Sequence, residues 1–493
     1  MVTSNLAFKE KNSIEPEVVV NESPVKWCAV ALSDVVARGK RLEASVFDVE
    51  AKQARATVVN GKYKWHALGG KDGLIQNAYY PGRFKRIYCD KRTGEAFYLP
   101  SQMAEVYPKS EKYISALTKC DISELRLKPN TLLLTRSGTI GTVSLVSKTT
   151  QGKVYSDDVI RVSFNEVYDT GFIYTFLKSK TGSKILTTNG YGSVITHLEP
   201  EHLATVPIPD APTMLKKKIH DLIVRSYELR DESNDLIDQA TALLIGELKL
   251  PDIDAFDVGL YKKAAPVDTF SVRLSEMSGR LDASYHMPIV DAIIEHLKRY
   301  AEEVTTVGDP RISREVILPG RFKRVYVDEG YGRVLIGGKQ LSELDPSSKK
   351  YLSTAKHDKM LKKLEVHEGT TLITRSGTIG KIAIVPKHWE HYIPSDHIIR
   401  VIPANKDIAG YLNIFLASDY GKVLITRFTY GSVVDEIDDN HVRQIAIPLL
   451  KNHTVQKKIN DLALEANEKR YQAYLLEQEA LQIMDRDVIY AKK

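Results

Sequence analysis

Thr135-Arg-Ser-Gly-Thr-Ile-Gly141 decides the architecture, because the same seven letters return as Thr374-Arg-Ser-Gly-Thr-Ile-Gly380. The interval of about 239 residues is far longer than the tens of residues in a solenoid repeat. Three more pairs recur in the same order: Pro81-Gly-Arg-Phe-Lys-Arg86 with Pro319-Gly-Arg-Phe-Lys-Arg324, Arg41-Leu-Glu-Ala-Ser45 with Arg280-Leu-Asp-Ala-Ser284, and Tyr191-Gly-Ser-Val194 with Tyr430-Gly-Ser-Val433. The chain therefore carries two copies of one whole domain, which suggests that its target is also read twice.

The length and composition fit a soluble protein of several domains. The chain has 493 residues, of which 43% are hydrophobic and 27% are charged. Length alone suggests about three domains, and the repeat refines this to two similar ones. We predict a tail at 1–26, a first repeat domain at 27–210, a long helix at 211–250, a linker at 251–266, a second repeat domain at 267–450 and a second long helix at 451–488.

Each repeat domain reads as short strands with interspersed helices. Apolar runs predict strands at 131–135, 142–146 and 159–164, and helices are expected at 44–54 and 171–187. Strands and helices do not alternate regularly. The expected fold class is therefore α+β, with two similar globular domains, rather than a doubly wound sheet.

Each repeat domain is followed by a predicted long helix whose apolar residues have the spacing of a coiled coil. The predicted seam comprises Leu215, Ile219, Leu222, Leu229, Leu236 and Leu243 in the first helix, and Val455, Ile459, Leu462, Leu476 and Ile483 in the second. Steps of three and four over about four heptads are typical of a coiled coil. Each helix would be about 45 Å long at 1.5 Å per residue. The alternative is that each helix packs only on its own domain.

An antiparallel pairing of these two helices would hold the two domains apart. A direct repeat in sequence would then become an approximate two-fold in space. Such an arrangement suits duplex DNA, whose strands are also related by local two-fold axes. The centres of two half-sites would lie roughly one helical turn of DNA apart, or slightly more.

The first candidate DNA-contact segment is a basic loop behind a Pro-Gly turn. Its residues are Arg83, Lys85, Arg86 and Tyr88 in the first repeat, and Arg321, Lys323, Arg324 and Tyr326 in the second. Cations in this spacing can face phosphates, or place one arginine at a guanine edge. A merely solvated loop is the alternative.

The second candidate segment is an arginine turn, and the third is a tyrosine loop. The arginine turn contributes Arg136, Ser137, Thr139, Arg375, Ser376 and Thr378, and the tyrosine loop contributes Tyr191, Ser193, Tyr430 and Ser432. Glycine lets the turn backbone approach a ligand, and the polar side chains can donate to phosphate oxygens. Alternatively the turn is structural, with Arg136 and Arg375 paired to carboxylates such as Asp157 and Asp396. Tyrosines suit base or sugar contact, although most are half-buried packing residues.

Composition also limits the class of protein. A net charge of +6 permits a polyanionic partner without requiring one. The three cysteines have no paired spacing, so we expect free thiols and a cytoplasmic location. No apolar run reaches the ~20 residues of a membrane span, and the first 21 residues lack a signal-peptide pattern. The sequence shows no phosphate loop and no zinc-spaced Cys or His pair, so we expect no enzyme and no metal.

The layout resembles the specificity (S) subunit of type I restriction–modification systems, over nearly the whole chain after residue 27. The resemblance rests on Arg280-Leu-Asp-Ala-Ser-Tyr285, on the two arginine turns, and on the domain exits Leu198-Glu-Pro-Glu-His-Leu-Ala-Thr-Val-Pro-Ile-Pro209 and Ile437-Asp-Asp-Asn-His-Val-Arg-Gln-Ile-Ala-Ile-Pro448. Each exit leads into a long helix. Such subunits often carry Pro-Pro-x-x-Glu-Gln there, whereas this chain has Pro209-Asp-Ala-Pro212 and Pro448-Leu-Leu-Lys451.

The resemblance implies a non-catalytic subunit without cofactors of its own. It would bind a split double-stranded DNA target, one half-site per target recognition domain. Two methyltransferase (modification) subunits would dock on it, bind S-adenosylmethionine and flip adenines out, and a restriction subunit would use ATP. If the repeated loops read bases, the half-sites should be related. Two alternatives are a stand-alone DNA-binding or regulatory protein on the same scaffold, and a nuclease or methyltransferase whose site is not evident.

Overall fold

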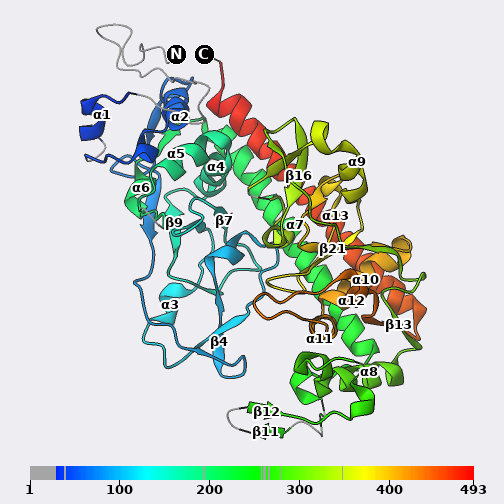
Figure 1. Ribbon diagram of the computed structural model, residues 1–493. Coiled ribbons are helices and arrows are strands. Elements are labelled where there is room, and N and C mark those ends of the chain that lie inside the picture. The colour runs from blue at the N-terminus through cyan, green and yellow to red at the C-terminus, as the bar shows by residue number, and fades with distance from the viewer. Residues whose placement is uncertain are drawn as a thin grey trace. The chain divides into compact units, whose positions relative to one another are not determined.

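The computed structural model describes residues 29–37, 40–192, 195–256, 258, 262–264, 267–277, 279–346 and 348–492. They form two compact units (Figure 1). The first unit comprises the chain up to Ala104, Pro108–Tyr227 and the chain from Leu476, and the second comprises Glu105–Tyr107 and Glu228–Leu475. Each unit thus holds most of one repeat domain together with segments of both long helices. The predicted tail at 1–26 lies outside the described residues.

Two four-stranded sheets form the β-structure of the first unit. One sheet has the order β2 (Ile75–Tyr79), β9 (Val159–Phe164), β6 (Leu132–Thr135) and β7 (Val143–Leu145), and the other has the order β3 (Tyr88–Cys89), β5 (Lys112–Ser115), β4 (Gly94–Tyr98) and β8 (Val154–Tyr155). Only β4 and β8 pair in parallel. A separate antiparallel pair joins β1 (Trp65–Ala67) to β10 (Pro207–Pro209). The three predicted strands correspond to β6, β7 and β9.

The second unit repeats this topology strand for strand. One four-stranded sheet has the order β14 (Ser313–Ile317), β21 (Ile398–Pro403), β18 (Thr371–Thr374) and β19 (Ile382–Ile384). The other has the order β15 (Tyr326–Val327), β17 (Lys350–Ser353), β16 (Gly332–Ile336) and β20 (Ile393–Pro394). A separate pair joins β13 (Glu303–Thr306) to β22 (Ala446–Leu449). Even the register irregularity recurs, between Ile75 and Asn77 and between Ser313 and Glu315. The α+β class is confirmed, and the two units share one strand order.

Helices complete each unit. The first unit has α1 (Leu32–Ala37), α2 (Val49–Val59), α3 (Ile122–Leu125), α4 (Val167–Lys178), α5 (Lys180–Thr188) and α6 (Pro200–Ala204), and the second has α8 (Pro288–Tyr300), α9 (Thr354–Leu364), α10 (Lys406–Ala417), α11 (Asp419–Thr426) and α12 (Asp439–Arg443). The helix predicted at 171–187 is broken at Ser179, whose hydroxyl caps α5 by accepting from the Gly182 N–H at 3.0 Å. A 3-10 turn, Ala44–Phe47, precedes α2.

The long helices are α7 (Thr213–Glu247) and α13 (His453–Ile483), and α13 continues into a π-helical turn, Met484–Ile489. A glycine lets each one dock on its own repeat domain. In the first unit, the Gly171 N–H of α4 donates to His220 Nδ1 of α7 at 3.2 Å. In the second, the Gly410 N–H of α10 donates to Asn460 Oδ1 of α13 at 2.8 Å. A β-carbon at either glycine would overlap the backbone of the long helix.

The two long helices also contact each other within each unit. In the second unit, Lys469 Nζ lies 2.7 Å from Glu232 Oε2, and Arg470 Nε donates to Ser233 Oγ at 3.2 Å. Farther along, Ala240 and Ala463 belong to one hydrophobic core. Higher numbers on α7 meet lower numbers on α13, so the helices run antiparallel there.

The buried face of these helices is wider than one seam. Of the predicted seam residues, Ile219, Leu229, Ile459 and Ile483 are buried, whereas Leu215, Leu222, Leu236, Leu243, Val455, Leu462 and Leu476 are half-buried. The neighbouring positions Ile223, Leu244 and Met484 are fully buried. Each helix therefore packs on repeat-domain residues and also on the other helix, so packing on its own domain alone does not account for its buried face.

A short hairpin spans the end of the predicted linker and the start of the predicted second repeat domain. Strand β11 (Lys262–Ala264) pairs antiparallel with β12 (Val267–Thr269). Before it, the Tyr420 hydroxyl donates to the Pro251 carbonyl at 2.7 Å, which ties the end of the first long-helix segment to the second unit. Across the described parts of the chain, no helix is both long and apolar enough to cross a bilayer.

Candidate nucleic-acid interface

The basic loop crosses from one sheet to the other with alternating side chains. It leads from β2 to β3 in the first unit. Arg83 and Lys85 are exposed, whereas Phe84 packs against the Phe97 core and Arg86 is half-buried. This period of two is the geometry of an extended strand. The loop therefore presents two of its three predicted cations to solvent.

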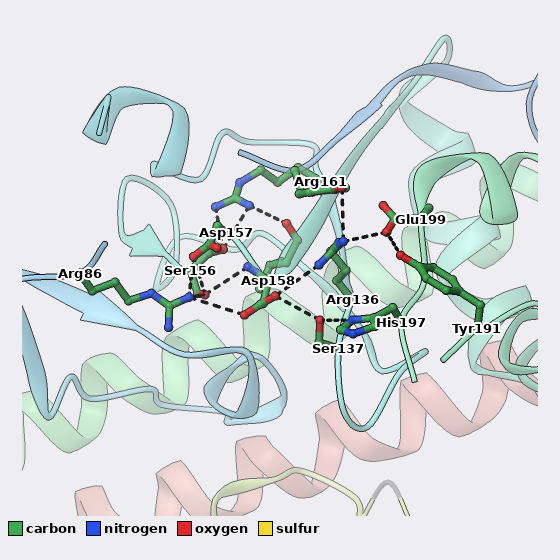
Figure 2. A network of polar contacts seen from close by, with 12 residues as sticks. Arg86, Arg136, Ser137, Ser156, Asp157, Asp158, Arg161, Tyr191, His197 and Glu199 are labelled. Atoms are coloured by element: carbon green, nitrogen blue, oxygen red, sulfur yellow. Dashed lines mark hydrogen bonds and ion pairs between the residues drawn. The ribbon is translucent and has the colours of Figure 1, made fainter. Parts of the chain in front are cut away.

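The third cation of the loop is held by carboxylates. Arg86 Nη2 lies 2.6 Å from Asp157 Oδ1 and 3.1 Å from Ser156 Oγ (Figure 2). Asp157 is only 4% exposed. Burial alone would lower the pKa of Arg86, but the ion pair with Asp157 outweighs it and raises that pKa. Arg86 thus anchors the loop to the bend between β8 and β9.

The second repeat builds the same loop. Arg321 and Lys323 are exposed, and Phe322 packs on the core beside Leu335 and Leu352. Arg324 forms an ion pair with Asp396. The alternation of exposed and anchored cations is therefore a property of the repeat and not of one copy.

The arginine turn is buried. Arg136 is 6% exposed, and its Nη2 lies 2.7 Å from Glu199 Oε1 (Figure 2). Its guanidinium stacks 4.2 Å from the centre of the Tyr80 ring. A second carboxylate, Asp158, lies 3.6 Å from Nη1. This geometry favours the structural alternative for the turn. The expected partner is corrected, because Asp157 is engaged by Arg86 instead.

The equivalent Arg375 is also buried. Its Nη2 lies 2.5 Å from Glu436 Oε2, and its Nε donates to the Ile437 carbonyl at 2.9 Å. The suggested partner Asp396 is taken by Arg324. In both repeats the turn arginine fastens the turn to the segment that follows the tyrosine loop.

The serine of each turn lies beside one acid and one histidine, whose sequence positions are exchanged between the repeats. Ser137 Oγ donates to Asp158 Oδ1 at 3.1 Å and lies 2.9 Å from His197 Nδ1. In the second repeat, His397 occupies the position of Asp158, and Glu436 occupies that of His197. Ser376 Oγ there lies 2.5 Å from His397 Nδ1. The exchange keeps one acid and one imidazole beside the turn.

The outer rim of the turn remains exposed. Thr139 and Thr378 are exposed, next to Gly138 and Gly377, whose φ angles of 78° and 73° form the left-handed bend. The carbonyl of Thr139 accepts from the Thr135 hydroxyl at 2.6 Å, which closes the turn. Each threonine side chain is thus the outward group of a rigid bend.

The tyrosine loop lies beside the arginine turn. The Tyr191 hydroxyl donates to Glu199 Oε1 at 2.5 Å, and this bond raises the pKa of Tyr191 (Figure 2). Tyr430 is 38% exposed and Ser432 is exposed. Ser193 lies outside the described residues. Burial would raise the pKa of Glu199, but the bonds from Tyr191 and Arg136 lower it overall.

Two cations beside the basic loop were missed from the sequence. Lys112 Nζ lies 5.2 Å from the centre of the Tyr88 ring, and Lys350 Nζ lies 5.8 Å from that of Tyr326. Both lysines are exposed, and both tyrosines are about half exposed. The signal was present, because Lys112-Tyr-Ile-Ser115 recurs as Lys350-Tyr-Leu-Ser353. Each repeat therefore groups three exposed cations with one exposed ring.

Each repeat also has a buried arginine in the strand that follows the anchoring aspartate. Arg161 is 2% exposed and donates to the carbonyls of Tyr155 and Val159 at 2.9 and 2.6 Å. Burial lowers its pKa to about 10, which still leaves the guanidinium charged at neutral pH. Arg400 occupies the same place in the second repeat. Arg161 thus fixes the bend between β8 and β9 that carries Asp157. Arg400 instead donates to the Lys363 carbonyl at 3.1 Å, at the end of α9.

No protein-family model matches this sequence, and no curated protein matches it. Three solved structures cover most of it. The S subunit of a type I restriction-modification system from M. genitalium is 13% identical, with 87% of this chain and 96% of that chain covered at a TM-score of 0.33. The HsdS subunit from Thermoanaerobacter tengcongensis is 11% identical, with 87% and 98% covered at 0.25.

The third structure comes from work on complex assembly and conformational transition of the type I R-M system. It is 12% identical to this chain, with 86% of this chain and 97% of that chain covered at a TM-score of 0.27. Two of these three structures are thus described as belonging to a type I restriction–modification system, and the other as an HsdS subunit.

Proposed function

We propose that this chain is the DNA-specificity subunit of a type I restriction–modification complex. In this role it binds a bipartite target, one half-site per repeat domain, and docks two methyltransferase subunits and one restriction subunit. The observation that carries the proposal is the duplicated display of exposed cations, Arg83 and Lys85 in one repeat and Arg321 and Lys323 in the other. Each display is fixed on the same strand crossover.

The composition of the display suits phosphates and base edges. An arginine can bind a guanine edge with two hydrogen bonds, and lysines neutralise phosphates. The exposed rings of Tyr88 and Tyr326 add flat apolar surface beside these cations. The buried arginines of the turn and the half-buried, ion-paired arginine of the loop hold this surface rigid, so little conformational entropy is lost on binding.

The long helices supply the spacing in this proposal. Thr213–Glu247 would span about 52 Å at 1.5 Å per residue. An antiparallel pair of such helices would relate the two displays by an approximate two-fold, which suits two half-sites separated by a gap of unspecified bases. The chain itself would methylate or cut nothing.

Affinity purification of the tagged chain from its native host, with mass spectrometry of the partners, tests the proposal. We expect a methyltransferase subunit at about two copies per chain, and site-specific adenine methylation by that complex. Recovery of a DNA-binding chain without any methyltransferase would contradict the proposal and favour a stand-alone DNA-binding protein. Methylation or cleavage by the chain alone would contradict the non-catalytic role.

A further inference from the structure

The second repeat brings two histidines and a glutamate together on two adjoining loops. His367 lies between α9 and β18, and Glu390 and His391 lie between the 3-10 turn Lys387–Trp389 and β20. Backbone bonds join the loops, because the His391 N–H donates to the Val366 carbonyl at 2.9 Å and the Val366 N–H donates to the Tyr392 carbonyl at 3.0 Å. Val366 belongs to the hydrophobic core under the loops, so the site stands on packed structure.

The three side chains already lie within reach of one ion. One potential ligand atom from each of His367, Glu390 and His391 lies within 4.8 Å of the others. His367 Nδ1 is 2.6 Å from Glu390 Oε1, and the second carboxylate oxygen of Glu390 accepts from the Glu368 N–H at 2.9 Å. One oxygen is thus held by backbone while the other faces the imidazole.

A second carboxylate orients His391. Glu365 Oε2 lies 3.1 Å from His391 Nδ1, and Arg333 Nη1 holds that carboxylate at 2.9 Å. Carboxylates that bond a ligating imidazole fix its ring and raise its basicity. The side chains of His367 and His391 are 57% and 52% exposed, so an ion can reach them from solvent.

Comparison between the repeats shows that these residues belong to the second copy alone. The same backbone bonds occur in the first repeat, where the Gly152 N–H donates to the Leu127 carbonyl at 2.9 Å. The positions of His367, Glu390 and His391 are occupied there by Lys128, Gln151 and Gly152.

His391 is the most informative of the three differences. Gly152 has φ of 77°, a conformation that glycine adopts freely. His391 has φ of 66° at the same place, where any β-carbon is strained. The second repeat therefore keeps an imidazole at a position where glycine would be the relaxed choice.

We propose that His367, His391 and Glu390 form a Zn²⁺ site specific to the second repeat domain. Two imidazoles and one carboxylate are a ligand set of zinc sites with an open position, here filled by water. The ion would clamp the loop after α9 to the loop before β20. This inference does not depend on the proposed function in DNA modification.

The test uses the full-length chain, prepared without a polyhistidine tag and stripped of metal. Isothermal titration with ZnCl₂ should give one ion per chain, Zn²⁺ should raise the Tm, and Co²⁺ should give visible absorption bands. The variants His367→Lys and His391→Gly carry the residues of the first repeat, so they should fold, and each should weaken Zn²⁺ binding at least about tenfold.

His453→Ala provides the matched control. His453 is also exposed in the second unit and lies 3.3 Å from Glu302, and its loss should leave Zn²⁺ binding unchanged. The proposal is overturned if the unmodified chain binds no stoichiometric ion, or if H367K and H391G bind Zn²⁺ as tightly as it does.

Discussion

Glu95 Oε1 lies 3.2 Å from Arg126 Nη1 in the first repeat, and the second repeat forms the same bridge with the charges exchanged. There Arg333 Nη1 lies 2.9 Å from Glu365 Oε2. Both bridges join β4 or its counterpart β16 to the loop before the central strand of the other sheet. Both repeats thus carry opposite charges at these two positions, although the residue at each position differs.

Reversing the charge of one partner in this bridge should destabilise the protein, whereas reversing both partners together should be tolerated. Glu95→Arg would place two guanidinium groups together and should destabilise the first unit by about 0.5–1 kcal/mol, because both side chains are partly solvated. The double variant Glu95→Arg with Arg126→Glu copies the second repeat and should recover most of this loss. Urea denaturation measures both values. Additive destabilisation in the double variant would show that the bridge does not contribute.

Substituting the exposed cations of the basic loop should weaken DNA binding, whereas substituting its anchored arginine should lower stability. Arg83→Ala and Lys85→Ala should leave the Tm unchanged, and each should reduce the slope of log K against log salt by about 1 if the side chain contacts a phosphate. Arg86→Ala should lower stability by about 2 kcal/mol, because buried Asp157 loses its charged partner. Fluorescence anisotropy on duplex DNA and thermal unfolding provide the two readouts. Equal effects of Arg83→Ala and Arg86→Ala on the Tm would contradict this division.

Gly410 should resist substitution because α10 lies against the backbone of α13. A β-carbon there would lie 2.3 Å from the Asn460 carbonyl oxygen and 3.0 Å from Ala463 Cβ. Gly410→Ala should therefore cost about 1–3 kcal/mol by overpacking, despite the better helix propensity of alanine.

Gly246→Ala is the matched control for this effect. Gly246 lies in α7, where a new β-carbon would meet nothing within 4 Å. Alanine there should stabilise the protein by up to about 1 kcal/mol through helix propensity alone. Destabilisation of similar size at Gly246 and Gly410 would show that close helix approach is not the cause.

His202 should make stability fall in mild acid. Its Nδ1 accepts from the Glu199 N–H at 3.2 Å in the capping box of α6, which requires a neutral ring. Burial, together with nearby Arg41, lowers the pKa of His202 below its ordinary value of about 6.5. The contribution is therefore fully present above pH 6.5 and is lost as the pH falls through the lowered folded-state pKa.

Substitution by glutamine tests this assignment. His202→Gln keeps an acceptor at the capping position and should make stability between pH 7 and pH 5 less dependent on pH. His202→Ala removes the acceptor and should lower stability at both ends of this range. Stability curves from urea denaturation at each pH would contradict the assignment if the glutamine variant kept the full acid-dependent loss.

The sequence by itself determined the duplication, the α+β class and the two long helices. These features depend on periodicity and on letter-for-letter repetition, which local propensity and hydrophobic spacing express directly. Val159–Phe164 was predicted at its observed bounds because a buried strand is a continuous apolar run. From the repeat alone, the sequence also predicts Arg83, Lys85, Arg321 and Lys323 as candidate DNA-contact positions.

The tertiary structure decided which arginines are anchors and which face solvent. Arg83 and Arg86 have the same charge and lie in one loop, but only Arg86 meets a carboxylate, and that carboxylate is 71 residues away in the chain. Likewise, the partner of Arg136 is Glu199 and not Asp157. Such ion pairs form between groups that folding brings close together in space. The spacing of two residues along the sequence does not give the distance between them in the folded chain.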